Sequence, residues 1–320
     1  MLMLCFDKLK IITSNQNLKD IDDNIFQTIS LNGIIQYHKY QQKIPSSLLI
    51  MVNYQHDELV IEFTSKILKD NFIHLINKNT IYECLNNINK LGICKLDIDN
   101  IILNSKVAKC DPVKDVVLNF CDIKDLEKYF KSNLTNYNKL ECKHYQNGFV
   151  INNTASTPRS KIRTTIYSKK NELDRAENKS FIDSLEDTEV LEYYNDKTRI
   201  EMNINTQVQI RQLLKIDNNQ LMSVLNSTAD PISTLLGKVI KETNVKNIHS
   251  YNLIDYKNEL VLKDCNYDLK QVEAKVRGLC SKTTSINRIM QPYKELYHRL
   301  QVNDIPEINL SELFSDNIYI

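Results

Sequence analysis

Residues 47–64, Ser-Leu-Leu-Ile-Met-Val-Asn-Tyr-Gln-His-Asp-Glu-Leu-Val-Ile-Glu-Phe-Thr, contain two apolar, β-rich runs joined by a short polar link. Such runs, separated by a few turn-forming residues, predict a β-hairpin. Because hairpins outnumber the spacings typical of βαβ units, we expect an α+β fold with a mainly antiparallel sheet and flanking helices. Further strand patterns cover residues 2–13, 143–152 and 161–168, and helical spacing covers residues 80–91 and 122–137.

The pattern changes near residue 207, after which helical spacing dominates. We therefore predict an α+β domain over residues 1–210 and a helical DNA-binding or accessory region over residues 211–320. Residues 270–299 hold seven basic and two acidic side chains, a balance that favours contact with a phosphate backbone. A solvated helix face is the alternative interpretation. The basic side chains expected to contact DNA in this region are Lys275, Arg277, Lys282 and Arg288.

The composition excludes several classes of protein. The 320 residues include 41 basic and 40 acidic side chains, which argues against a uniformly basic surface. There are five glycines and no Gly-rich motif, so a phosphate-binding loop is excluded. The six histidines and eight cysteines form no HxH, HExxH or CxxC pair, so a zinc site is not expected. No apolar run reaches the ~18–20 residues of a membrane span, and the N-terminus is unlike a secretory signal. We expect a cytoplasmic protein without membrane contact.

The basic stretch 159–175 carries the clearest chemical signal, because six basic residues and two acids surround Tyr167. On a strand, Arg163, Thr165 and Tyr167 share one face, since side chains alternate with a period of two. A phenol has an ordinary pKa of about 10, so nearby cations or a metal would help it ionise and attack. Lys170 would neutralise a phosphate oxygen or assist proton transfer. A solvated strand edge with a half-buried tyrosine is the alternative.

Single acidic residues interrupt three apolar strand patterns, at Glu62, at Asp97 with Asp99, and at Glu201. A carboxylate inside a strand is costly unless it is paired or binds a metal. Several acids that converge form a site for a hard cation such as Mg²⁺ or Mn²⁺ beside a phosphate. Alternatively, each acid points to solvent or pairs with a neighbour such as Arg199.

Four segments, taken in order, resemble the gene II/X type rolling-circle replication initiators of filamentous phages and related plasmids. The similarity spans roughly residues 1–215, and the helical remainder matches only in general character. Many other rolling-circle initiators carry a His-hydrophobe-His metal motif, which this chain lacks. The segments are the acidic strand and helix of 59–68, the hydrophobe-Asp strand of 94–99, the Tyr-x-x-Lys-x-Glu-like nicking segment of 165–173, and the Arg-hydrophobe-Glu strand of 199–204.

The resemblance implies a DNA nickase and strand transferase. Tyr167 would attack one phosphodiester of the replication origin, leaving a 5′-phosphotyrosine and a free 3′-OH. Glu62 and Asp97, with Glu172 and Glu201, would hold Mg²⁺ or Mn²⁺, and Tyr167, Glu62 and Asp97 should converge on one sheet face. The expected partners are origin DNA and a host helicase and polymerase in a bacterial cell. The remaining side chains expected to contact DNA are Arg159, Lys161, Arg163, Lys169 and Arg199.

Two alternatives belong to other classes of protein. One is a non-catalytic, origin-binding regulator on the same fold, and the other is a relaxase-like mobilisation protein that shares the chemistry. Tyr145, Tyr193 and Tyr194 could supply a second nucleophile or could be packing residues.

Overall fold

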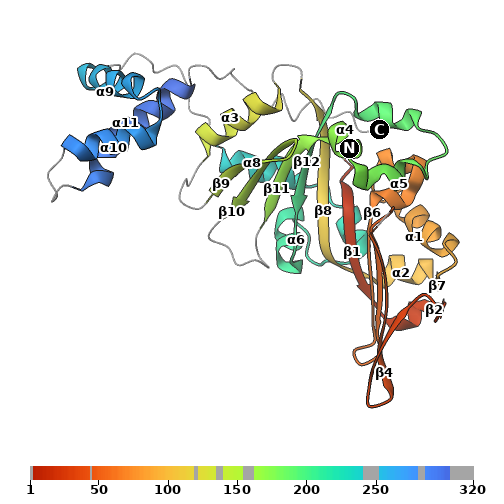
Figure 1. The fold of residues 1–320 in the computed structure, drawn as a ribbon. Helices are drawn as coiled ribbons and strands as arrows, with labels where there is room; N and C mark the ends of the chain where they lie inside the picture. The colour runs from red at the N-terminus through yellow and green to blue at the C-terminus, as the bar shows by residue number, and fades with distance from the viewer. Residues whose placement is uncertain are drawn as a thin grey trace. The chain divides into compact units, whose positions relative to one another are not determined.

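The computed structural model describes residues 3–43, 45–118, 122–134, 140–153, 162–240, 252–279 and 285–302. Within these residues, ten strands form one large sheet and two short strands form a second sheet (Figure 1). Neighbouring strands in both sheets are antiparallel. The expected α+β fold with a mainly antiparallel sheet is confirmed.

The large sheet has the strand order β3-β4-β5-β6-β1-β8-β12-β11-β10-β9. The predicted hairpin is confirmed, because β5 and β6 pair across a short link with Val52 opposite Leu59. The bounds are β1 Cys5–Thr13, β3 Gln27–Leu31, β4 Ile34–Gln42, β5 Leu48–Asn53, β6 Glu58–Thr64, β8 Lys106–Val117, β9 Leu140–Tyr145, β10 Gly148–Asn153, β11 Arg163–Ser168 and β12 Lys197–Asn203.

Two segments differ from the expected strands. Residues 143–152 form parts of two strands rather than one, because the chain turns at Gln146, whose φ is 49°. Residues 94–99 hold only the short strand β7 (Cys94–Leu96), which pairs with β2 (Leu18–Ile21), and helix α2 (Ile98–Asn104) follows directly.

The chain divides into two compact units. One holds both sheets, and the other consists of α3 with the last three described helices around a core that includes Leu262, Val272 and Met290. This division differs from the expected boundary at residue 210, because α6, α7 and α8 pack on β8 in the sheet unit. The helices concerned are α3 Ile123–Asn133, α6 Gln207–Leu214, α7 Leu221–Leu225, α8 Pro231–Val239, α9 Leu253–Asp264, α10 Leu269–Leu279 and α11 Ile286–Val302.

Helix α8 covers one face of the large sheet. Lys114 of β8 lies opposite Ile200 of β12 in the ladder, and its buried ammonium bonds Asp230 at the start of α8. Side chains alternate along a strand, so Arg199 and Glu201 point to the other face. We call this other face, which also carries Tyr167, the polar face.

Short helices close one end of the polar face. Phe72, Phe181 and Tyr194 pack together there, with the Phe72 ring edge-to-face against Phe181 at 5.1 Å and tilted against Tyr194 at 5.4 Å between ring centroids. Among the described helices, none has the length and apolar character needed to cross a membrane. The remaining elements are η1 Asn15–Asn17, η2 Ser65–His74, α1 Ile81–Lys90, α4 Lys169–Leu173, η3 Ala176–Asn178, α5 Lys179–Ile182 and η4 Glu189–Tyr194.

Candidate active site

Alternate residues of β11 and β12 lie side by side on the polar face. Paired residues of adjacent strands point to the same side of a sheet, so the two side chains of each pair are neighbours on that face. The expected alternation along β11 is therefore confirmed. The pairs are Arg163 with Asn203, Thr165 with Glu201, and Tyr167 with Arg199.

The hydroxyl of Tyr167 is held against a carboxylate. It donates a 3.1 Å hydrogen bond to Oε2 of Glu201, whose Oε1 accepts a 3.1 Å bond from Nδ2 of Asn203. Burial raises the pKa of Tyr167 well above its ordinary value, the charge of Glu201 raises it further, and Arg199 only partly opposes them. The expectation that surrounding cations make this phenol easier to ionise is wrong for the protein alone. A bound cation would have to change that balance.

A β-bulge in β1 brings Asp7 to the same face. The register against β8 shifts between Phe6 and Lys8, which leaves Asp7 as the extra residue. Phe6 and Leu9 are buried, whereas Asp7 and Lys8 between them are only half-buried. Both polar side chains thus turn to the polar face, and bulges commonly re-aim side chains beside functional sites. Asp7 was not among the expected site residues.

Arg199 is buried among acidic side chains rather than exposed at the surface, where the expected contact with DNA would require it. Its side chain is fully buried, with Nε and Nη2 each 2.7 Å from a carboxylate oxygen of Asp115. Nη1 donates to Asp7 at 2.8 Å, and Nη2 also donates to the hydroxyl of Tyr194 at 3.1 Å. A planar guanidinium that is paired on several sides supports the acids around it, and no surface remains for a phosphate. Tyr194, which is fully buried against it, is a packing residue.

Three carboxylates on neighbouring strands repel one another. Burial raises the pKa of Asp111 to about 7, and the charge of Glu201 is the next cause. Burial and then the charge of Asp7 raise the pKa of Glu201. Like charges in a partly desolvated site favour the protonated form of at least one partner. Burial would also raise the pKa of Asp7, but the charges of Lys169 and Arg199 lower it overall, so the negative charge of this cluster resides mainly on Asp7.

The chemistry of these donors fits a hard divalent cation. Carboxylate oxygens are the preferred ligands of Mg²⁺ and Mn²⁺, and a cation would relieve the repulsion between Asp7, Asp111 and Glu201. As their side chains are placed, no three His, Cys, Asp or Glu residues of the described chain form a group that could hold a metal ion. Side chains would have to rotate to close a coordination shell.

Lys169, rather than Lys170, lies beside Tyr167. Its ammonium is 5.9 Å from the centroid of the Tyr167 ring and 2.7 Å from Oε2 of Glu172, and its side chain is buried. Lys170 is on the next position of α4 and pairs with Asp174 at 2.9 Å on the surface. Burial alone would raise the pKa of Glu172, but the charges of Lys169 and a second lysine lower it. Glu172 thus belongs to the site as an ion-paired residue.

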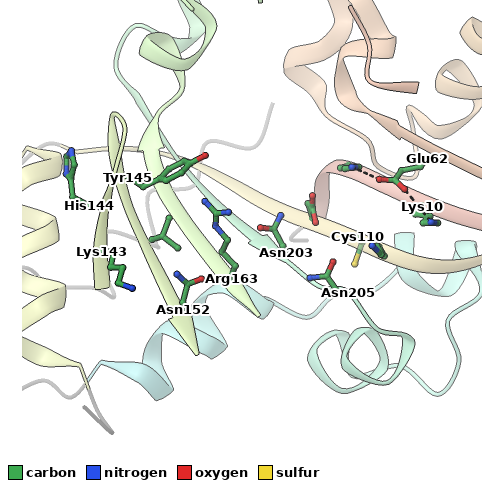
Figure 2. Close-up of a pocket in the computed structure, with 14 residues that line it drawn as sticks. Lys10, Glu62, Cys110, Lys143, His144, Tyr145, Asn152, Arg163, Asn203 and Asn205 are labelled. Carbon is green, nitrogen blue, oxygen red and sulfur yellow. Dashed lines mark ion pairs between the residues drawn. The ribbon is translucent and has the colours of Figure 1, made fainter. Parts of the chain in front are cut away.

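Glu62 lies on the polar face, but with lysines rather than with Tyr167. It pairs with Lys8 and, at 3.5 Å, with Lys10 (Figure 2). Burial would raise the pKa of Glu62, yet its bond to Lys8 lowers the pKa overall. Its role as a metal ligand remains a prediction that competes with these two ammonium groups.

Asp97 is not part of the site, and the expectation that it joins Tyr167 and Glu62 is wrong. It is the N-cap of α2, where its carboxylate accepts bonds from the backbone N–H of Asn100 at 3.3 Å and from its amide at 2.9 Å. It also pairs with Lys19 of β2 at 3.1 Å. A helix N-terminus leaves N–H groups without partners, and Asp is among the residues that best satisfy them.

Two pockets adjoin on the polar face. The smaller has a volume of about 280 Å³ and includes Asp7, Tyr167, Lys169, Glu172 and Glu201 in its lining. The larger has a volume of about 670 Å³ (Figure 2). Tyr145, Arg163 and Asn203 line both pockets, so we describe them together as one groove. Among its described lining residues, the larger pocket has five cations, Lys8, Lys10, Lys109, Lys143 and Arg163, against the carboxylates Glu62 and Asp111.

The other residues expected to contact DNA lie elsewhere. Arg159, Lys161 and Lys282 are outside the described residues. In the second unit, Lys275 pairs with Asp264, and Arg277 pairs with Glu273 at 2.6 Å. Arg288 is exposed on α11. The basic residues of this unit remain candidates for DNA contact, although ion pairs already engage two of them.

Comparison of the chain with models of protein families, with curated proteins and with solved structures found no match.

Proposed function

We propose that the protein nicks and rejoins origin DNA during rolling-circle replication, with Tyr167 as the nucleophile. The observation that carries this proposal is the hydrogen bond from Tyr167 to Glu201 at one end of a basic groove. A nucleophile that is already bonded to a base is the arrangement expected of covalent catalysis.

Nicking would exchange one ester bond of the phosphate for another. The phenol oxygen of Tyr167 forms a bond to phosphorus while the bond from phosphorus to the 3′-oxygen breaks. Glu201 accepts the phenol proton, and the departing 3′-oxygen takes a proton from solvent. The raised pKa of Glu201 suits a general base that must also release its proton on the return reaction.

The surrounding residues would hold the phosphate and the strand. The ammonium of Lys169 lies beside the Tyr167 ring, where it would offset charge on a phosphate oxygen. Asp7 and Asp111 would hold Mg²⁺ or Mn²⁺, with Glu62 and Glu172 as further expected ligands, whereas Glu201, expected from the sequence as a ligand, would instead accept the phenol proton. When bound, a divalent cation polarises the phosphate and stabilises the leaving oxygen. The lysines of the larger pocket would follow the phosphates of the strand.

The free 3′-OH would serve a host polymerase behind a host helicase in the bacterial cytoplasm. A relaxase-like mobilisation protein would use the same chemistry for transfer rather than replication.

A second candidate, a DNA-binding regulator without catalysis, is favoured by one observation. The pKa of Tyr167 is raised rather than lowered, which makes attack harder unless a cation is bound.

Covalent capture tests the proposal without a known origin. The full-length protein is incubated with a random-sequence library of single-stranded DNA and Mg²⁺ or Mn²⁺, and complexes that survive denaturant are sequenced. We expect one enriched sequence with the wild type and with Tyr193→Phe, and none with Tyr167→Phe or with EDTA. Adducts with Tyr167→Phe would overturn the assignment. Sequence-specific binding without any adduct would support the regulator instead.

A further inference from the structure

Tyr145 and Tyr167 lie in one row of the sheet, with a glycine between them. Tyr145 of β9 is paired with Gly148 of β10, which is paired with Tyr167 of β11. Two strand spacings separate the tyrosines, which corresponds to about 10 Å between their backbones. A Cβ on Gly148 would lie 1.9 Å from the carbonyl oxygen of Ile166, so this position excludes a side chain. The floor between the two rings is therefore bare backbone.

The guanidinium group of Arg163 lies over the ring of Tyr145. The central carbon of the Arg163 guanidinium is 4.7 Å from the centroid of the Tyr145 ring, and Tyr145 is 40% exposed. Within the described chain, Nε of Arg163 is buried and has no hydrogen-bond partner. Arg163 thus leaves donor capacity unused at a place where both pockets meet.

The surroundings match the chemistry of a nucleotide. Lys143, whose exposed ammonium pairs with Glu141 at 2.7 Å, lies on one side of the pair, and the amides of Asn152 and Asn203 point into the same pocket (Figure 2). Planar aromatic and guanidinium groups stack on the face of any base, and flanking cations bind its phosphates. Asparagine amides provide both donors and acceptors for base edges, and Asn203, whose Nδ2 already donates to Glu201, keeps its carbonyl oxygen as an acceptor.

A purely structural role explains these features less well. Tyr145 ends an edge strand, and its contact with Arg163 is open to solvent, where such cation–π pairs contribute only about 0.5–1 kcal/mol. A stabilising contact would not need a buried donor without a partner, because an unpaired buried donor costs free energy.

We propose that Tyr145 and Arg163 form a stacking platform for one base of single-stranded DNA, two strands away from Tyr167. That the stacked base flanks the phosphate under attack rests on the proposed function, whereas the binding itself does not. In this arrangement Tyr145 and Arg163 are positioning residues.

Binding to two oligomers of equal charge tests the platform. The full-length protein is titrated into fluorescent oligothymidine of about 12 nucleotides, a typical single-strand site size, and into an abasic oligomer of equal length. We expect Tyr145→Leu to weaken oligothymidine binding roughly 5- to 100-fold, which corresponds to the stacking of one base. The same variant should leave binding to the abasic oligomer unchanged.

Conservative variants separate stacking from charge and from misfolding. Tyr145→Phe should bind like the wild type, and Arg163→Lys should lose affinity for oligothymidine only, because it keeps charge but not the planar group. Lys143→Ala should weaken both oligomers equally. The platform would be overturned if Tyr145→Leu affected both oligomers equally or affected neither. It would also be overturned if the wild type showed no measurable binding of oligothymidine.

The outcomes distinguish this inference from the proposed function. Base-dependent binding through Tyr145 without any covalent adduct leaves the platform standing and removes the nickase. An adduct on Tyr167 without base-dependent binding through Tyr145 does the reverse.

Discussion

The hydroxyl of Tyr167 lies 3.1 Å from Oε2 of Glu201, across the ladder between β11 and β12. This bond aims the phenol proton at a buried acid whose pKa burial raises. Burial, and then the charge of Glu201, raise the pKa of Tyr167 well above its ordinary value in the free protein. Activity should therefore depend on Glu201 more than on the carboxylate expected first from the sequence, Glu62.

Replacement of Glu201 tests this dependence. Glu201→Gln can still accept the hydrogen bond but takes up a proton poorly, so we expect the rate of adduct formation to fall by about 100-fold or more. Binding of single-stranded DNA should persist. Glu62→Gln is the comparison. It removes an expected metal ligand that Lys8 and Lys10 already engage, so it should lower the rate less than Glu201→Gln does. If Glu62→Gln slowed adduct formation more than Glu201→Gln in single-turnover assays, Glu62 rather than Glu201 would have the main catalytic role.

Lys169 and Lys170 are adjacent in sequence but differ in environment. Lys169→Gln removes the buried ammonium beside Tyr167 and should slow adduct formation roughly 10-fold or more, because such charges stabilise a phosphoryl transition state. Lys170→Gln removes only a surface partner of Asp174 and should have the wild-type rate. A larger loss with Lys170→Gln would show that the lysines exchange roles when DNA binds.

Arg199 should matter for stability rather than for DNA affinity. Arg199→Met leaves Asp115 buried without its partner, and the free energy of unfolding in urea should fall by about 3–5 kcal/mol. Arg277→Ala, which breaks an exposed ion pair, is the control and should cost about 1 kcal/mol or less. A stable Arg199→Met protein with weakened DNA binding would contradict the structural role.

Asp111 should make stability depend on pH. Its pKa of about 7 in the folded protein lies above its ordinary value of 3.8, so the folded state keeps a proton that the unfolded chain releases. The contribution of Asp111 to the free energy of unfolding should then fall as pH rises from about 4 through 7. Asp111→Asn stays neutral, so at pH 8 it should be more stable than the wild type by roughly 2–4 kcal/mol.

Urea unfolding at pH 4 and pH 8 measures this difference. The two proteins should be nearly equally stable at the lower pH. The exposed Asp174→Asn variant serves as the control and should follow the wild type at both values. A wild type whose stability rises over this interval relative to Asp111→Asn would place a compensating cation near Asp111.

The strand patterns predicted the sheet because they are local. The apolar runs of β5 and β6 and the alternation along β11 depend only on neighbouring residues, and these put Tyr167 and Glu201 within reach. The prediction that Asp97 joins the site was wrong because the same alternation of apolar and acidic residues also occurs where a strand ends and a helix begins. The spacing from Asp97 to Asn100, typical of an N-cap and its helix, was the signal against a strand.

The missed residues depend on long-range packing. Asp7 is a single acid in an apolar strand pattern, the criterion that selected Glu62, but only the bulge explains how it joins Tyr167. Nor could the burial of Arg199 be inferred, because its partners Asp7 and Asp115 lie on two other strands. Lys169 rather than Lys170 lies beside Tyr167 because helix α4 begins directly after Ser168. The change from strand to helix alters the direction in which each following side chain points.

The most direct test of the account is the mass of the peptide that carries the nucleotide after trypsin digestion of the captured adduct. Cleavage after lysine and arginine places Tyr167 in residues 164–169, Tyr145 in residues 144–159, and Tyr193 with Tyr194 in residues 180–197. We predict the added nucleotide mass on residues 164–169 alone. The mass on either of the other two peptides would contradict it.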